Sequence, residues 1–142
     1  MFKSILLPID LSSKASWVKA LPAALSMVRN YGADLHVVSV LPDFGMTIVS
    51  GYFKEGYEDQ AMADFGHKLA EWVEENIPDD VDVHPHVLHG TIYAEVLRAA
   101  KKLSCDLIIL ASHRPELSDY LLGPNAARVV RHASQTVLVV RE

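Results

Sequence analysis

The stretch Leu107-Ile-Ile-Leu-Ala-Ser-His-Arg-Pro115 leads into Tyr120-Leu-Leu-Gly-Pro-Asn-Ala-Ala-Arg-Val-Val-Arg-His132 and then into Thr136-Val-Leu-Val-Val140. This order predicts a buried strand, a loop, a helix opened by a glycine and a second strand. In an open parallel α/β sheet, such a unit presents backbone N–H groups to a phosphate at the start of the helix. Pro124, directly after Gly123, removes one of those N–H donors, so the pattern alone leaves open whether a nucleotide binds there.

The rest of the chain repeats this alternation of short apolar runs and helical patterns. Further strands are expected at Ser4–Ile9, Leu35–Leu41 and Val81–Leu88, and further helices at Ser13–Tyr31, Glu58–Asn76 and Thr91–Leu103. Pro22 should kink the first helix, Gly32 should cap it, and Pro85 makes the third run an edge strand. Residues 42–56 are expected to form a long loop. The pattern predicts one flavodoxin-like three-layer α/β domain over residues 1–142, with a five-stranded parallel sheet of order 3-2-1-4-5.

Composition narrows the classes of function. The 142 residues are 50% hydrophobic, which is enough for a full core, and the net charge of -5 argues against general binding to nucleic acid. Cys105 is the single cysteine, so an intrachain disulfide is excluded, and its place before an apolar run indicates a core residue. No apolar run is long enough for a signal peptide or a membrane span, so we expect a soluble cytoplasmic protein.

Ligands of such sheets bind beyond the carboxyl ends of the strands, where the strand order reverses, here between the first and fourth strands. The segments that meet there are Pro8-Ile-Asp10, Ser39-Val-Leu41 and Ala111-Ser-His-Arg-Pro115, together with Gly123. The carboxylate of Asp10 can accept a hydrogen bond from a sugar hydroxyl or an exocyclic amine, or it can cap the first helix. The two roles are compatible, and both stay open.

Five segments occur in order along the chain: Ile5-Leu-Leu-Pro-Ile-Asp-Leu-Ser12, Gly32-Ala-Asp-Leu-His-Val-Val-Ser-Val40, Cys105-Asp-Leu-Ile-Ile-Leu-Ala-Ser-His-Arg-Pro115, Leu121-Leu-Gly-Pro-Asn-Ala-Ala-Arg-Val-Val-Arg-His132 and Val137-Leu-Val-Val-Arg141. Together they resemble the universal stress protein family over nearly the whole chain. The loop after the fourth strand resembles the branch of that family that carries Ser-His-Arg-Pro.

The resemblance implies a small stress-response regulator that binds ATP, with Mg²⁺ only as the companion of the triphosphate. Pro8, Ile9 and Asp10 would flank adenine and ribose, Val40 would face the base through its backbone, and Gly123 would open the phosphate-binding helix. The resemblance also implies a homodimer formed by antiparallel pairing of the strand Thr136–Val140, an apolar run with little to protect an edge.

The phosphate loop departs from the family pattern Gly-x-x-Gly, nine residues, Gly-Ser/Thr. Ala111 and Arg114 replace the first two glycines, and Pro124 replaces the Ser or Thr, which deletes a hydroxyl and an N–H. Cationic donors remain available nearby, because Arg114 and His113 can bind phosphate. The full candidate site is therefore Pro8, Ile9, Asp10, Val40, Ala111, Ser112, His113, Arg114, Gly123, Pro124 and Asn125.

Other interpretations carry less support. A nucleotide-free dimeric interaction module, with a phosphate site that has decayed, is the main alternative. We expect no catalytic activity, because the chain lacks a Gly-x-Ser-x-Gly elbow, a Walker lysine and paired carboxylates, and slow ATP hydrolysis has no candidate base. The histidines near the third strand have spacing that could suit a metal, although edge-strand histidines are the better interpretation: His84, His86 and His89.

Overall fold

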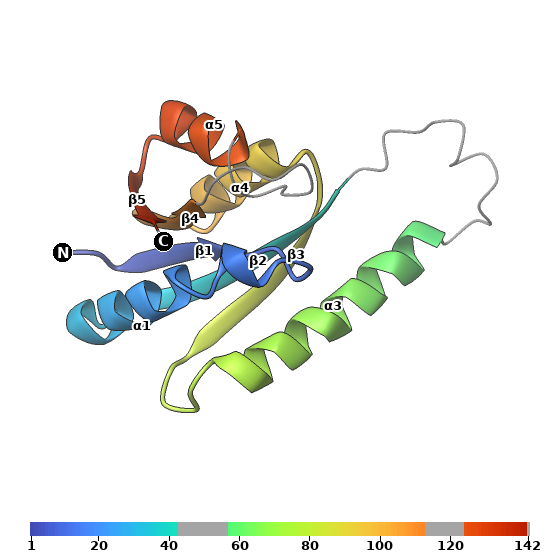
Figure 1. Ribbon diagram of the computed structural model, residues 1–142, viewed down its shortest axis with the longest axis horizontal. Helices are drawn as coiled ribbons and strands as arrows, with labels where there is room; N and C mark the ends of the chain where they lie inside the picture. Colours follow the sequence, from blue (N-terminus) through green and yellow to red (C-terminus); the bar gives the residue numbers. More distant parts are fainter. Residues whose placement is uncertain (43–56, 113–123, 142) are drawn as a thin grey trace.

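The structure, a computed structural model, describes residues 1–42, 57–112 and 124–141. Five parallel strands form one sheet of order β3-β2-β1-β4-β5, with helices on both faces (Figure 1). The elements are β1 (Ser4–Pro8), a 3-10 turn η1 (Lys14–Ser16), α1 (Ala20–Tyr31), β2 (Asp34–Pro42), α3 (Tyr57–Asn76), β3 (Val83–Gly90), α4 (Ile92–Lys102), β4 (Leu107–Ser112), α5 (Pro124–His132) and β5 (Thr136–Arg141). The predicted fold class and strand order are confirmed.

The central strands are apolar throughout because helices cover both of their faces. Residues Ile5, Leu6 and Leu7 of β1 are fully buried, and so is nearly all of β4. Uninterrupted apolar runs of this kind are typical of parallel strands in the middle of a sheet. β1 ends at Pro8, one residue before its predicted end at Ile9, and Pro8 itself has no N–H to donate to a ladder.

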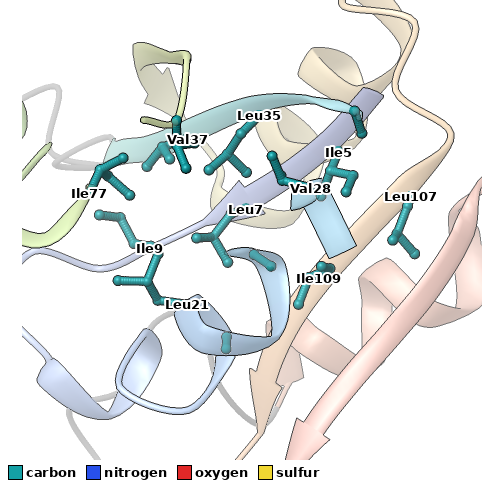
Figure 2. Packing of buried hydrophobic residues seen from close by; sticks show 14 of the residues in the cluster. Ile5, Leu7, Ile9, Leu21, Val28, Leu35, Val37, Ile77, Leu107 and Ile109 are labelled. Atoms are coloured by element: carbon teal, nitrogen blue, oxygen red, sulfur yellow. The ribbon is translucent and has the colours of Figure 1, made fainter. Parts of the chain in front are cut away.

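Successive residues of the central strands serve the two faces in turn. On one face, Leu7 packs in a cluster with Leu21 of α1 (Figure 2). Leu69 and Trp72 of α3 belong to the same cluster. On the other face, Leu6 packs in a cluster with Val96 of α4 and Val129 of α5. The three layers hold the carboxyl ends of the strands at one edge of the molecule, where the candidate site lies.

The first helix differs from its prediction. Instead of one helix kinked at Pro22, the chain forms η1 and then starts α1 only at Ala20. Pro22 thus lies in the first turn of α1, where its missing N–H has no partner to lose, whereas a helix continued upstream would bring its ring against the Val18 carbonyl. The predicted cap is confirmed, since Gly32 adopts φ 63° and ψ 32° and its N–H donates to the Val28 carbonyl.

Two further expectations concern single segments. Cys105 is buried in the core, as predicted, and burial raises the pKa of its thiol, so it stays protonated at neutral pH. β3 lies at an edge of the sheet, as Pro85 indicates. No helix in the described ranges combines the length and the apolar character needed to cross a bilayer. The predicted long loop lies almost wholly outside the described residues.

Candidate functional site

The reversal of strand order leaves the carboxyl ends of β1 and β4 unjoined within the described part of the chain. The ladder between these strands ends at Leu6 and Ile108. On its other side β1 stays paired with β2 as far as Pro8, and the Ile9 N–H still donates to the Val38 carbonyl at 2.9 Å. Ligands of open α/β sheets bind at this kind of place.

Asp10 follows at the end of β1 and is held by serine hydroxyls. Its N–H donates to the Ser16 hydroxyl at 2.8 Å, and that hydroxyl donates to the Ser13 carbonyl at 2.7 Å. Its Oδ1 accepts from both the N–H and the hydroxyl of Ser12, at 2.9 and 2.7 Å. Asp10 therefore stabilises the turn after β1 by an Asx-type contact, and it does not cap α1, which begins at Ala20.

The second carboxylate oxygen of Asp10 is different. Oδ2 is buried, and it has no hydrogen-bond partner among the described residues. A buried acceptor without a partner costs about 1–3 kcal/mol, and native structures seldom leave one without a ligand, ion or water. Because Oδ1 already serves the turn, Oδ2 is left as an acceptor for an N–H or O–H group that none of the described residues supplies.

The neighbouring strand β2 contributes backbone more than side chains. The hydroxyl of Ser39, which is 1% exposed, donates to the Ile9 carbonyl at 2.9 Å and ties the end of β1 to β2. Val40 follows, and its side chain packs in the core beneath α4 and α5.

The phosphate side of the candidate site lies at the end of β4 and the start of α5. Ala111 is buried and Ser112 half-buried at the carboxyl end of β4. Pro124 is the exposed first residue of α5, a position that suits its fixed φ but supplies no N–H, and Asn125 is half-buried beside it. Three of the predicted site residues lie outside the described ranges: His113, Arg114 and Gly123.

The predicted histidine cluster gains a member. His84 and His86 lie on one face of β3, and the ring of His36 from β2 stacks against both. His36 is not among the residues that the sequence suggests, although the in-register pairing of β2 with β3 is the signal that would have found it. Across the described residues, no three His, Cys, Asp or Glu side chains are grouped so that they could hold a metal ion.

Sequence comparison finds relatives along the whole chain. The sequence model of the universal stress protein family matches residues 1–141. Universal stress protein G from Shigella flexneri is 29% identical over 143 residues, which cover 99% of this chain and 100% of that protein. Universal stress protein MJ0531 from Methanocaldococcus jannaschii is 29% identical over 153 residues, which cover 100% of this chain and 84% of that protein.

Solved structures share the fold. The universal stress protein UspA from Lactobacillus plantarum superposes with a TM-score of 0.69 at 21% identity, covering 98% of this chain and 97% of the other. A universal stress protein solved in complex with cAMP gives a TM-score of 0.70 at 17% identity, covering 99% and 97%. The match of the family model to residues 1–141 shows that this chain belongs to the universal stress protein family.

Proposed function

We propose that this protein binds ATP or a related adenine nucleotide at the carboxyl ends of β1 and β4, and that it acts as a homodimeric cytoplasmic regulator without catalysis of its own. The observation that carries the proposal is the buried Oδ2 of Asp10, which has no partner among the described residues and lies at the point where the strand order reverses. A universal stress protein of the same fold has been solved with cAMP, an adenine nucleotide, which supports this class of ligand.

Different residues of the site contact different parts of the nucleotide. Oδ2 of Asp10 accepts from a ribose hydroxyl or the adenine amine. Pro8 and Ile9 bring their backbone beside the ring, because the Ile9 side chain is 1% exposed and packs in the core. The backbone of Val40 faces the base. Phosphate oxygens lie toward Ser112 and the start of α5, where we also expect donors from the following residues: His113, Arg114 and Asn125.

The test is calorimetric titration of ATP with Mg²⁺ into protein stripped of nucleotide, with Asp10→Asn as the decisive variant. Asparagine keeps an acceptor for the contacts with Ser12, but its amide can replace the acceptor at Oδ2 by a donor. Losing a hydrogen bond to a charged acceptor weakens binding by about ten- to a hundredfold. We expect micromolar or tighter binding in the wild type, a loss of that size in Asp10→Asn, and little change in folding stability.

Asp80→Asn is the matched control, because it removes the same charge from an exposed pair with Arg29, 3.3 Å apart, at the opposite end of α1. It should bind nucleotide as the wild type does. A second readout is fluorescence, since Trp17 follows the Asp10 turn and packs edge-on against Trp72, the only other tryptophan, at 5.5 Å. Absence of heat and of any fluorescence change up to millimolar ATP would contradict the proposal.

A second candidate function, a nucleotide-free interaction module, is favoured by Pro124. This residue begins α5, so the first turn of the helix offers a phosphate one N–H fewer than usual. The two candidates differ in the titration described above. If neither ATP nor cAMP binds while the protein is a dimer, the interaction module is the better account.

A further inference from the structure

Three imidazole rings lie together on the face of β2 and β3 that α4 covers; we call them the histidine cluster, formed by His36, His84 and His86. His36 lies opposite His84 in the parallel register and diagonal to His86. The ring centroids of His36 lie 5.0 Å from those of His84 and 5.2 Å from those of His86, with the planes tilted by 30° and 28°. One strand of the pair, β3, is an edge strand of the sheet.

A direct contact joins two of the rings. Nδ1 of His36 and Nε2 of His86 are 3.0 Å apart, which is a hydrogen-bond distance between ring nitrogens. Such a bond needs one ring to donate and the other to accept, so at least one of the two must be neutral. When both rings are protonated, both nitrogens carry hydrogens, and the bond becomes a contact between two cations.

The charges around the cluster make a second proton harder to add. Burial lowers the pKa of both His36 and His86, and the neighbouring rings of the cluster lower them further. From α4, Lys102 adds positive charge beside His86, and it too lowers that pKa. Two negative charges lie near the starts of the strands. Asp34 favours the charged form of His36 and so raises its pKa. Asp82 lies 3.6 Å from His84, but its side chain is 87% exposed.

We propose that the histidine cluster is a proton-sensitive contact between β2 and the edge strand β3, closed at neutral pH and opened by protonation. In the opened segment His36 and His86 regain the ordinary pKa of about 6.5 and bind more protons than in the closed one. Stability of the contact is therefore fully present above that pH and is lost as the pH falls through it. β3 responds first because, in the described part of the chain, it forms a ladder with β2 alone, whereas β1 and β4 are paired on both sides.

Native-state hydrogen exchange of the intact protein, read by mass spectrometry from about pH 7.5 to about pH 5.5, tests this proposal. After correction for intrinsic exchange, the opening equilibrium constant of the β3 peptides should rise as the pH falls. Each proton that only the open form binds raises it by up to about tenfold per pH unit. Peptides from β4 should stay protected. No pH dependence in β3, or an equal dependence in β4, overturns the proposal.

Two variants identify the groups responsible. His36→Gln and His86→Gln each remove one ring of the bonded pair, and each should flatten the pH dependence of β3 opening. His67→Gln is the matched control, because it removes an exposed histidine from α3 and should leave the wild-type slope unchanged. If one of the two variants folds poorly, the other variant still tests the proposal. An NMR titration of the wild-type imidazoles then shows directly whether His36 and His86 take up protons over the pH range in which β3 opens. A wild-type slope that persists in the His36 or His86 variant overturns the proposal.

Discussion

Gly32 and Gly66 show how the same substitution, glycine to alanine, can move stability in opposite directions. Gly32 has φ 63°, and a Cβ built there meets nothing within 4 Å, so Gly32→Ala brings backbone strain without a clash and should lower the free energy of unfolding by about 1 kcal/mol. Gly66 lies within α3, where a Cβ would make ordinary contact with Val87 of β3 at 3.8 Å. Gly66→Ala should therefore raise the free energy of unfolding by about 0.5–1 kcal/mol.

Urea unfolding followed by far-ultraviolet circular dichroism measures both changes, and each variant serves as the control for the other. An unchanged slope with urea concentration would show that the variants alter stability and not the compactness of the unfolded state. If Gly66→Ala proves destabilising, the packing of α3 against β3 is tighter than described. If Gly32→Ala is neutral, the end of α1 rearranges without the left-handed cap.

At the scale of single residues, the sequence predicts that Asp10 belongs to the site but does not predict that one of its carboxylate oxygens lacks a partner among the described residues. A polar residue directly after a buried strand is easy to recognise, because the turn there needs one. The unpartnered state of Oδ2 follows from the serines that occupy the other polar atoms, Ser12 and Ser16, and these contacts depend on how the turn folds. His36 could not be predicted as a member of the histidine cluster for a related reason. Its partners lie on β3, and which residues of β3 face it depends on the register between β2 and β3.

At the scale of elements, the start of α5 is where the proposed phosphate site can be improved. Pro124→Ala restores an N–H to the first turn, and Pro124→Ser restores the N–H together with a hydroxyl. A hydrogen bond to a charged phosphate contributes about 1.5–3 kcal/mol, so Pro124→Ser should tighten nucleotide binding by about ten- to a hundredfold. Pro124→Ala should account for part of that gain, and calorimetric titration measures both.

The pair of variants separates the two groups that proline deletes. Equal gains in both would assign the effect to the N–H, while a gain confined to Pro124→Ser would assign it to the hydroxyl. Unchanged affinity in both, with wild-type folding, would mean that the start of α5 does not contact phosphate. The helix itself should tolerate either change, because proline at the first position contributes little beyond its fixed φ.

Elements with strong apolar patterns could be predicted to within about two residues, because burial on both faces dictates an uninterrupted run. β1 and β5 show this, since each differs from its predicted range by one residue. The predicted end of the first helix at Tyr31 is confirmed, but its predicted start at Ser13 was wrong, because helical spacing of apolar residues continues upstream of the point where a proline allows the helix to begin. The helical spacing of apolar residues cannot by itself distinguish a helix that kinks at a proline from a new helix that begins there.

At the scale of the whole molecule, the two edges of the sheet are unequal. β3 carries Pro85, which is exposed and cannot donate to a further strand, beside the histidine cluster. Within β5, the residues from Val137 to Val140 form an uninterrupted apolar segment that is only half-buried. Unprotected apolar edges favour pairing with another chain, so β5 is the edge that a second copy should use. Its antiparallel pairing with itself is the homodimer that we propose.

Val139 is the residue at which this assembly can be tested without damage to the core. Among the described residues, Val137 packs on the α4 side and Val140 on the α1 side, whereas Val139 belongs to neither core cluster. Val139→Lys places a charge on the edge strand, a substitution that discourages strand pairing in natural sheets. Light scattering should show a dimer for the wild type and the mass of one chain, 15.7 kDa, for the variant.

Val18→Lys is the matched control, because it adds the same charge at a valine that lies beyond η1 and is 43% exposed, and this variant should stay dimeric. A wild-type monomer would refute the homodimer, and a dimer that survives Val139→Lys would move the interface away from β5.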